Sequence, residues 1–224
     1  MIVTIDGPAG AGKSTAARWL ADRLGFEFLD TGALYRAVTY AAVVAEVSPQ
    51  DQLALEKLLA ARTMEFDSGH LSIDGKDVAT QIRDPEITRR VRDYAELEVV
   101  RTFLTKRSRE LAEGKDIVTE GRDQGTVVFP NAEVKFFVTA SVEERAGRRH
   151  REFVKHGRNI PFDQVVADQI ERDRRDSERT LSPLRKADDA MEIDTTGLDM
   201  NEVVDALEIL VRERMKAKKS SATS

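Results

Sequence analysis

The stretch Gly7-Pro8-Ala9-Gly10-Ala11-Gly12-Lys13-Ser14 determines how the rest of the chain is interpreted. It follows a short apolar run, Ile2-Val3-Thr4-Ile5, and precedes a segment whose apolar residues recur at helical spacing from Thr15 onward. The spacing of its glycines lets the backbone curve so that successive N–H groups face one anion. Placed between a strand and the N-terminus of a helix, this pattern predicts a loop that binds the phosphates of a nucleotide.

The polar residues of this loop suit a triphosphate. Lys13 would bridge the β- and γ-phosphates, and the Ser14 hydroxyl would ligate Mg²⁺. Thr15 and the following residues begin a helix whose N-terminus adds partial positive charge. A Gly-rich turn before an ordinary helix is the alternative, but the strand and helix on either side favour the phosphate loop.

Composition restricts the class of protein. The 224 residues are 41% hydrophobic, 33% charged and only 6% aromatic, which is typical of a helix-rich globular protein. There is no Cys, and there are three His, so a disulfide framework and a thiolate metal site are excluded. The net charge of −5 argues against a dedicated nucleic-acid binder. No apolar run reaches membrane-spanning length and a signal peptide has no room, so we expect a cytoplasmic protein.

The order of predicted elements indicates an α/β fold. A strand, a loop, a helix and a second strand at 26–29 form a βαβ unit, which places ligands at the carboxyl ends of parallel strands. Further strands are predicted at 117–119, 134–138 and 191–194. Residues 63–84 instead alternate short β-like pieces with turns such as Asp67-Ser68-Gly69, and therefore form an insertion.

Helix signals occupy the segments between these strands. Ser48-Pro49 resembles an N-cap with Pro at the first helical position, and residues 85–111 are helical in pattern with a possible break. Ser141-x-x-Glu144 and Asp199-x-x-Glu202 are capping boxes. Each motif predicts that a helix begins immediately after its N-cap residue, Ser141 or Asp199.

Three further clusters of charged residues are candidates for a second ligand. They are Asp30-Thr31-Gly32 with Arg36, Glu120-Gly121-Arg122-Asp123, and Arg172 with Asp176 and Arg179. Arginine suits a phosphate, and a carboxylate suits an amino or hydroxyl donor. Taken singly, each cluster has a structural alternative: a turn with a solvated arginine, a surface ion pair, or ordinary helical ion pairs.

Arginines are also dense between Arg145 and Arg185. Such a segment could close over a triphosphate and exclude water, which phosphoryl transfer requires. It could equally be a solvated face or a contact for RNA. The negative total charge makes RNA the weakest of these interpretations.

Together these segments resemble the bacterial cytidylate kinase family, the P-loop enzymes that phosphorylate CMP and dCMP. The matching segments are residues 5–14, 29–36, 121–130, 143–146 and 172–176. The first is general to nucleotide-binding proteins, whereas the second and third, in this order, are specific. The resemblance covers nearly the whole chain. It implies a three-layer P-loop kinase fold with a central five-stranded parallel sheet, a small β-containing monophosphate-binding insert and an Arg-rich lid.

The resemblance also implies which residues bind the acceptor. They are Thr31, Arg36, Arg101, Arg122, Asp123, Arg172, Asp176 and Arg179. By position, Arg36, Arg122 and Arg179 would hold the CMP phosphate, with Thr31 nearby.

The remaining acceptor residues would bind the nucleoside. Arg101 and Asp123 would recognise cytosine, and Arg172 and Asp176 would hold the sugar. Gln124 stands where the family usually has Met.

On the donor side, the resemblance implies that the loop from Gly7 to Thr15 and the lid residues Arg148 and Arg149 bind ATP with Mg²⁺. The implied catalytic cations are Lys13, Arg122, Arg148 and Arg179. We expect one domain over residues 1–219, with the insert at about 36–110, the lid at about 148–165 and a flexible tail at 220–224. We expect a monomer whose partners are small molecules rather than nucleic acid or membrane.

The implied reaction transfers the γ-phosphoryl group of ATP to CMP or dCMP, giving CDP or dCDP and ADP. The acceptor oxygen is already ionised at neutral pH, so no general base is required. Three other hypotheses are a P-loop kinase with another acceptor, a nucleotide-dependent switch and a basic RNA-binding module. A GTPase switch would carry an Asn/Thr-Lys-x-Asp motif, and Thr105-Lys106-Arg107-Ser108 fails at its last position.

Overall fold

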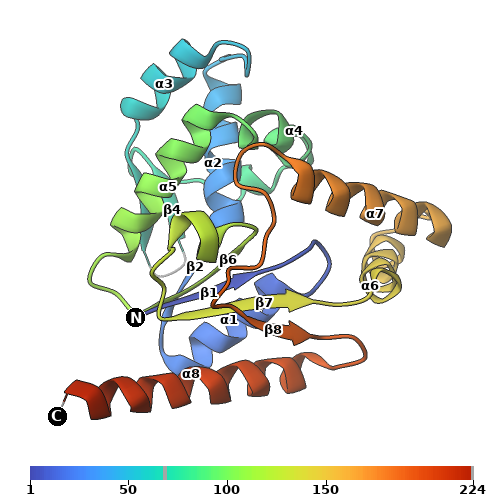
Figure 1. Cartoon of the computed structure of the whole chain (residues 1–224). Helices are drawn as coiled ribbons and strands as arrows, with labels where there is room; N and C mark the ends of the chain where they lie inside the picture. The colour runs from blue at the N-terminus through green and yellow to red at the C-terminus, as the bar shows by residue number, and fades with distance from the viewer. Residues whose placement is uncertain (68–69, 223–224) are drawn as a thin grey trace. The chain divides into compact units, whose positions relative to one another are not determined.

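The computed structural model describes residues 1–67 and 70–222. Ser68 and Gly69, part of a predicted turn, lie outside the described residues, as do residues 223 and 224. The chain divides into two compact units. Figure 1 draws the chain coloured by residue number, with its helices and strands labelled. Unit 1 consists of Met1–Phe28 with Asp116–Ser224, and unit 2 is Leu29–Lys115. The predicted insert at 36–110 falls inside unit 2.

Unit 1 is built on a five-stranded sheet with the order β2-β6-β1-β7-β8. The strands are β1 (Ile2–Asp6), β2 (Glu27–Leu29), β6 (Ile117–Gly121), β7 (Val134–Thr139) and β8 (Met191–Asp194). The central strand β1 pairs in parallel with both β6 and β7, and β7 pairs in parallel with β8. The predicted five-stranded parallel sheet is confirmed.

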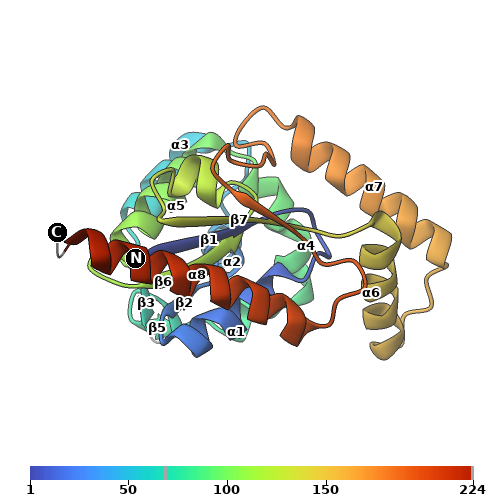
Figure 2. The same cartoon turned by 60° about the horizontal axis from the view of Figure 1, so that its bottom comes forward.

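The core of unit 1 forms where two helices cover one face of this sheet. Helices α1 (Lys13–Leu24) and α8 (Met200–Ala222) lie side by side on that face in Figures 1 and 2. Val3 and Ile5 of β1 are completely buried in one cluster with Leu20 of α1 and Leu207 of α8. Burying such apolar side chains is the main favourable term in folding. This packing therefore holds β1 in place, and with it the start of the loop that follows the strand.

Helices α6 (Val142–Lys155) and α7 (Phe162–Glu178) pack together as a hairpin in unit 1. The Ser141 Oγ accepts a hydrogen bond from the Glu144 N–H at 3.1 Å. The Glu202 N–H donates to Asp199 Oδ1 at 3.0 Å, and the Asp199 N–H donates to Glu202 Oε2 at 2.8 Å. Both predicted helix starts are therefore confirmed. Helix α8 continues through Ala222, into the segment predicted as a tail.

Unit 2 combines helices with a small antiparallel sheet. Its elements are α2 (Thr31–Val44), α3 (Gln52–Ala60), β3 (Met64–Asp67), β4 (His70–Ile73), β5 (Lys76–Asp77), a 3₁₀ turn (Gln81–Arg83), α4 (Pro85–Ala95) and α5 (Glu98–Ala112). The sheet order β3-β4-β5 confirms the β-containing insertion. The break predicted within 85–111 falls between α4 and α5.

The start predicted for α3 at Ser48-Pro49 is wrong. The helix begins at Gln52, because the Asp51 carboxylate caps it by accepting the Ala54 N–H at 2.9 Å. The Ser48 hydroxyl instead accepts the Gln50 N–H at 3.3 Å in the preceding turn. Serine and aspartate are both good N-cap residues. Because the Ser48 hydroxyl is already hydrogen-bonded within the turn, Asp51 caps the helix.

Candidate active site

The loop between β1 and α1 has the conformation that its glycines require. Gly7, Gly10 and Gly12 have φ values of 147°, 79° and 86°. A Cβ at Gly7 would lie 1.9 Å from the carbonyl oxygen of Val138 in β7, so only glycine fits there. Helix α1 begins after Gly12 with no side-chain cap. Its first N–H groups therefore suit an anion.

Lys13 lies inside this loop. Its side chain is buried, and Nζ donates a hydrogen bond to the Pro8 carbonyl oxygen at 2.7 Å. Burial, reinforced by the positive charge of Arg122, lowers the pKa of Lys13 to about 7. A protonated amine in this position attracts a nearby phosphate strongly, because little water is present to screen the two charges.

Ser14 and Glu120 supply the oxygen atoms that suit Mg²⁺. The Ser14 hydroxyl donates to Glu120 Oε1 at 2.9 Å, which joins the start of α1 to the end of β6. Hydroxyl and carboxylate oxygens are hard ligands, so this pair fits the metal expected from the sequence. From the sequence, only Ser14 was expected to bind the metal, whereas Glu120 was placed in a charged cluster for a second ligand. The position of Glu120 at the carboxyl end of a buried strand is the signal that could have assigned it to the metal.

Asp6 ties the segment after β6 to the strand that leads into the loop. Its buried carboxylate accepts the Gln124 N–H at 2.9 Å and the Gly125 N–H at 2.7 Å. Burial raises the pKa of Asp6 to about 6 against these two hydrogen bonds. Gln124 begins a π-helical turn, Gln124–Val128, directly after Arg122 and Asp123. Asp6 therefore fixes the backbone next to both candidate residues, a role that the sequence argument missed.

Arg122 and Asp176 form a direct ion pair. Arg122 Nε donates to Asp176 Oδ2 at 2.8 Å, and both side chains are about four-fifths buried, with exposed fractions of 19% and 21%. Burial opposes ionisation of Asp176, but the charge and hydrogen bond of Arg122 hold the pKa of this carboxyl below its usual value. The positive charges of Arg172 and Arg179 also lower the pKa of Asp176, and the charge of Arg172 lowers the pKa of Lys13. The structure thus brings three of the predicted arginines, Arg122, Arg172 and Arg179, together around Asp176.

The two predicted lid arginines lie differently on α6. Arg148 is half-buried; its Nη2 donates to the Thr195 carbonyl oxygen at 2.8 Å, and its Nη1 would lie 3.6 Å from a Cβ at Gly12. Arg149 is exposed, pairs with Glu152 at 2.7 Å and stacks over Phe153. Arg148 is therefore at the phosphate loop, whereas Arg149 stays within the ion pairs of its own helix.

The candidates in unit 2 cluster on α2 and α5. Asp30 caps α2 by accepting the Ala33 N–H at 2.8 Å, and it lies 3.7 Å from Arg36. The buried Nε of Arg36 has no hydrogen-bond partner among the described residues. The buried Arg101 guanidinium of α5 lies 5.7 Å from the ring centre of Tyr35. The Arg101 guanidinium thus lies over the ring of Tyr35, an aromatic residue that was not among the candidates expected from the sequence.

Comparison with known proteins assigns the chain. The model of the cytidylate kinase family matches residues 3–213. The chain belongs to the cytidylate kinase family. It is 43% identical to a cytidylate kinase of Rhodopirellula baltica over 100% of this chain and 98% of the relative. It is 45% identical to one of Halalkalibacterium halodurans over 96% and 99% of the two chains. The family assigned from the sequence is confirmed, and the protein is a nucleoside monophosphate kinase, a transferase acting on CMP.

Solved structures support the fold of this cytidylate kinase family member. A gluconokinase from Sinorhizobium meliloti matches 98% of this chain and 96% of its own with a TM-score of 0.50 and 18% identity. A protein from Eubacterium ventriosum matches 95% and 98% of the two chains with a TM-score of 0.54 and 11% identity. These similarities concern the fold alone. Among the described residues, no helix has the length and apolar character needed to span a membrane.

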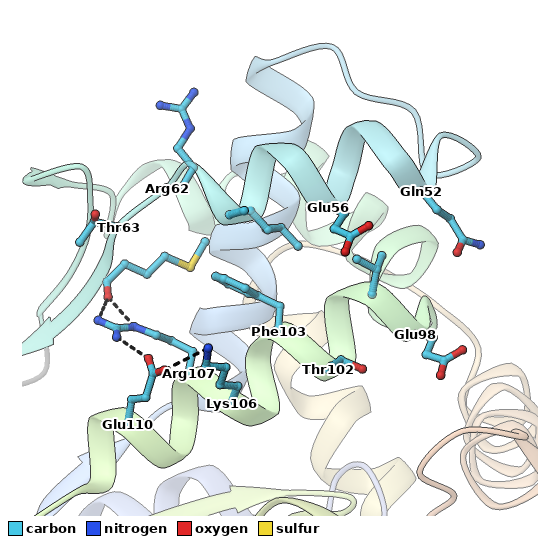
Figure 3. Close-up of a pocket in the computed structure, with 14 residues that line it drawn as sticks. Gln52, Glu56, Arg62, Thr63, Glu98, Thr102, Phe103, Lys106, Arg107 and Glu110 are labelled. Carbon is cyan, nitrogen blue, oxygen red and sulfur yellow. Dashed lines mark hydrogen bonds and ion pairs between the residues drawn. The ribbon is translucent and has the colours of Figure 1, made fainter.

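A groove on unit 2 has a different character from the phosphate loop. It lies between α3 and α5, has a volume of about 770 Å³, and is drawn in Figure 3. Its charged lining residues balance: they are Glu56, Glu98 and Glu110 against Arg62, Lys106 and Arg107. Arg107 points to the Met64 carbonyl oxygen and to Glu110 in Figure 3. The groove contains none of the predicted site residues and lacks an excess of positive charge.

Proposed function

We propose that this protein transfers the γ-phosphoryl group of ATP to CMP and to dCMP, giving CDP or dCDP and ADP. The observation that carries the proposal is the buried Lys13 amine, held within the glycine loop and close enough to Arg122 for the two charges to interact. Two cations beside an uncapped helix N-terminus suit the charge that develops on a transferred phosphoryl group. Membership of the cytidylate kinase family supports CMP as acceptor.

On the donor side, Lys13 and the loop from Gly7 to Thr15 would bind the ATP phosphates, with Arg148 and Arg149 from the lid. The position of Arg148 beside Gly12 supports its part in this. Ser14 and Glu120 would hold Mg²⁺, which when bound neutralises phosphate charge.

On the acceptor side, Arg36, Arg122 and Arg179 would hold the CMP phosphate, with Thr31 nearby. The buried Nε of Arg36, which lacks a described partner, supports a bound anion in unit 2. No general base is required, because the attacking phosphate oxygen is already ionised. The arginines therefore act by orienting an anion and offsetting its charge.

Arg101 and Asp123 would recognise cytosine, and Arg172 and Asp176 would hold the sugar. Cytosine presents an amino donor that Asp123 can accept, whereas uracil would place a carbonyl oxygen against the carboxylate. An unpaired buried polar group costs about 1–3 kcal/mol, which corresponds to a preference of roughly ten- to a hundredfold. The buried position of Asp123 supports this role.

An assay of ADP release with Mg-ATP tests the proposal against CMP, dCMP, UMP, AMP, GMP and no acceptor. We expect CMP and dCMP to exceed all other acceptors. Activity spread evenly over the nucleotides would remove Asp123 and Arg101 as determinants of specificity. ADP release without any acceptor would contradict phosphoryl transfer to a nucleotide. Asp123→Ala should raise the KM for CMP much more than that for ATP.

We further propose that the enzyme acts as a monomer and works in the cytoplasm.

A further inference from the structure

Two buried polar side chains of the α6–α7 hairpin have no part in the scheme above. Arg145 of α6 and Gln169 of α7 have exposed fractions of 4% and 6%. Both donate to one acceptor, the carbonyl oxygen of Ala9 in the phosphate loop. The Arg145 Nη1 lies 3.2 Å from this oxygen, and the Gln169 Nε2 lies 2.7 Å from it.

A carboxylate and a carbonyl hold Arg145 in this position. Arg145 Nη1 forms an ion pair with Asp173 Oδ2 of α7 at 2.7 Å, and its Nε donates to the Ala140 carbonyl oxygen at 2.9 Å. Asp173 Oδ1 is also 3.5 Å from Gln169 Nε2. Since buried polar networks are rigid when their members are satisfied, both donors reach Ala9 in a fixed geometry.

Helix α6 also packs directly on the next residue of the loop. A Cβ at Gly10 would lie 3.0 Å from Arg145 Cβ and 3.3 Å from its carbonyl oxygen. The hairpin therefore holds the peptide between Ala9 and Gly10 at two points, through two donors at the Ala9 oxygen and through the packing of Arg145 of α6 against Gly10. Because a trans peptide is planar with C=O and N–H opposed, fixing the Ala9 carbonyl toward the hairpin turns the Gly10 N–H away from it.

We propose that Arg145 and Gln169 are positioning residues for the donor phosphates, and that Asp173 keeps Arg145 in place. They hold the Ala9–Gly10 peptide in the orientation that offers the Gly10 N–H to a phosphate. Helix α7 carries Gln169 and Asp173 as well as Asp176, which binds Arg122. One helix thus supports both the donor loop and an arginine assigned to the acceptor. The inference rests on the proposed function for the identity of the nucleotides.

The test replaces Gln169 by methionine, which has a similar length but cannot donate to Ala9. Gln164→Met is the matched control, because Gln164 is exposed on the same helix. We measure KM for ATP and for CMP, kcat, the Kd for ADP by calorimetry, and thermal unfolding. Losing a buried hydrogen bond should raise the KM for ATP and the Kd for ADP by roughly tenfold in Gln169→Met. The KM for CMP and the control variant should stay within about twofold of the parent protein.

Equal rises in the KM values for ATP and CMP, or a lower unfolding temperature with unchanged ADP affinity, would show only structural support and overturn the inference. Asp173→Asn, which keeps its shape but loses its charge, should shift ADP affinity in the same direction. If Gln169→Met does not fold, Asp173→Asn is measured in its place. ADP binding also separates this inference from the proposed function. A wild-type protein that binds ADP but does not phosphorylate CMP refutes the function alone, while the ADP comparison still tests the positioning role.

Discussion

At the scale of single residues, the site is a set of charged groups that the fold buries. Asp6 and Glu120 lie at the ends of buried strands and Lys13 lies at the start of α1. All three are buried, and burial of a charge is unfavourable unless partners compensate. Each has a neutral hydrogen-bond partner: two backbone N–H groups for Asp6, a carbonyl for Lys13 and a hydroxyl for Glu120. The same burial strengthens the electrostatic interaction of these groups with a bound phosphate and its metal. Burial at these positions therefore costs stability and supports function.

Lys13→Ala tests this opposition. Turnover should fall by roughly a hundredfold or more, because the amine stabilises charge on the transferred group. Folding should persist, and the unfolding temperature should not drop, since the variant no longer buries an ammonium group. Lys106→Ala is the control, because the Lys106 side chain is 81% exposed and should change neither property. A Lys13→Ala enzyme with near-normal turnover would remove the loop from catalysis.

Asp6→Asn should reveal the raised pKa of Asp6 in the pH dependence of stability. The pKa is about 6 in the folded protein against an ordinary value of 3.8, so the folded state binds more protons between these values. The contribution of Asp6 to stability is therefore complete below the lower value and is lost as pH rises through the upper one. Asn does not titrate. The unfolding temperature of Asp6→Asn relative to the parent should increase from about pH 4 to pH 7 and then level off.

Thermal unfolding at several pH values measures this difference, and Asp51→Asn, which changes an exposed cap of α3, serves as the comparison. A difference between Asp6→Asn and the parent that stays constant across pH would show that Asp6 titrates normally in the folded protein.

At the scale of elements, local patterns predicted more than long-range ones. The capping boxes at Ser141 and Asp199 and the glycine loop are signals within a few residues, so each could be recognised from the sequence. The hydrogen bonds of Asp6 join residues 118 and 119 positions apart, and no periodicity reports such a pairing. The contacts of Gln169 and Arg145 with Ala9 could not be predicted from the sequence for the same reason, since they depend on how a helical hairpin packs on a loop.

The π-helical turn after Asp123 depends on close backbone approach at Gly125. A Cβ there would lie 2.9 Å from Thr4 Oγ1, 3.2 Å from Lys135 Cδ and 3.3 Å from Asp6 Oδ2. Thr4 is completely buried in β1 and cannot easily move. Gly125→Ala should therefore destabilise the protein by about 1–3 kcal/mol through overpacking. Because the turn begins next to Asp123, the KM for CMP should also rise.

Gly147→Ala provides the matched control for this variant. Gly147 lies within α6, and outside the backbone of that helix the nearest described atom to a Cβ there would be Arg151 Nη1, at 3.5 Å. Alanine at a helical position with space should stabilise by about 0.5–1 kcal/mol. Chemical denaturation of both variants measures the two effects. Similar effects in Gly125→Ala and Gly147→Ala would contradict the close approach at the turn.

At the scale of the whole molecule, the fold and the acceptor are separate properties. A gluconokinase with 18% identity has a similar fold over nearly the whole chain, although its name indicates an acceptor that is not a nucleotide. Fold alone therefore does not assign the acceptor in such proteins. In this chain the acceptor was predicted from short motifs at 29–36 and 121–130, which lie at the ends of β2 and β6.

The oligomeric state is a property of the whole surface, and the exposed apolar residues favour a monomer. The large ones lie on different elements, for example Val44 on α2, Val154 on α6 and Ile209 on α8. Within the described ranges, no helix exposes more than two of them. A stable dimer usually buries about 800 Å² per partner around an apolar centre. Light scattering after size exclusion should therefore give a mass near 25.1 kDa over a wide concentration range, with or without ATP and CMP. A mass that doubles with concentration, together with specific activity that rises in parallel, would instead place part of the function in a dimer.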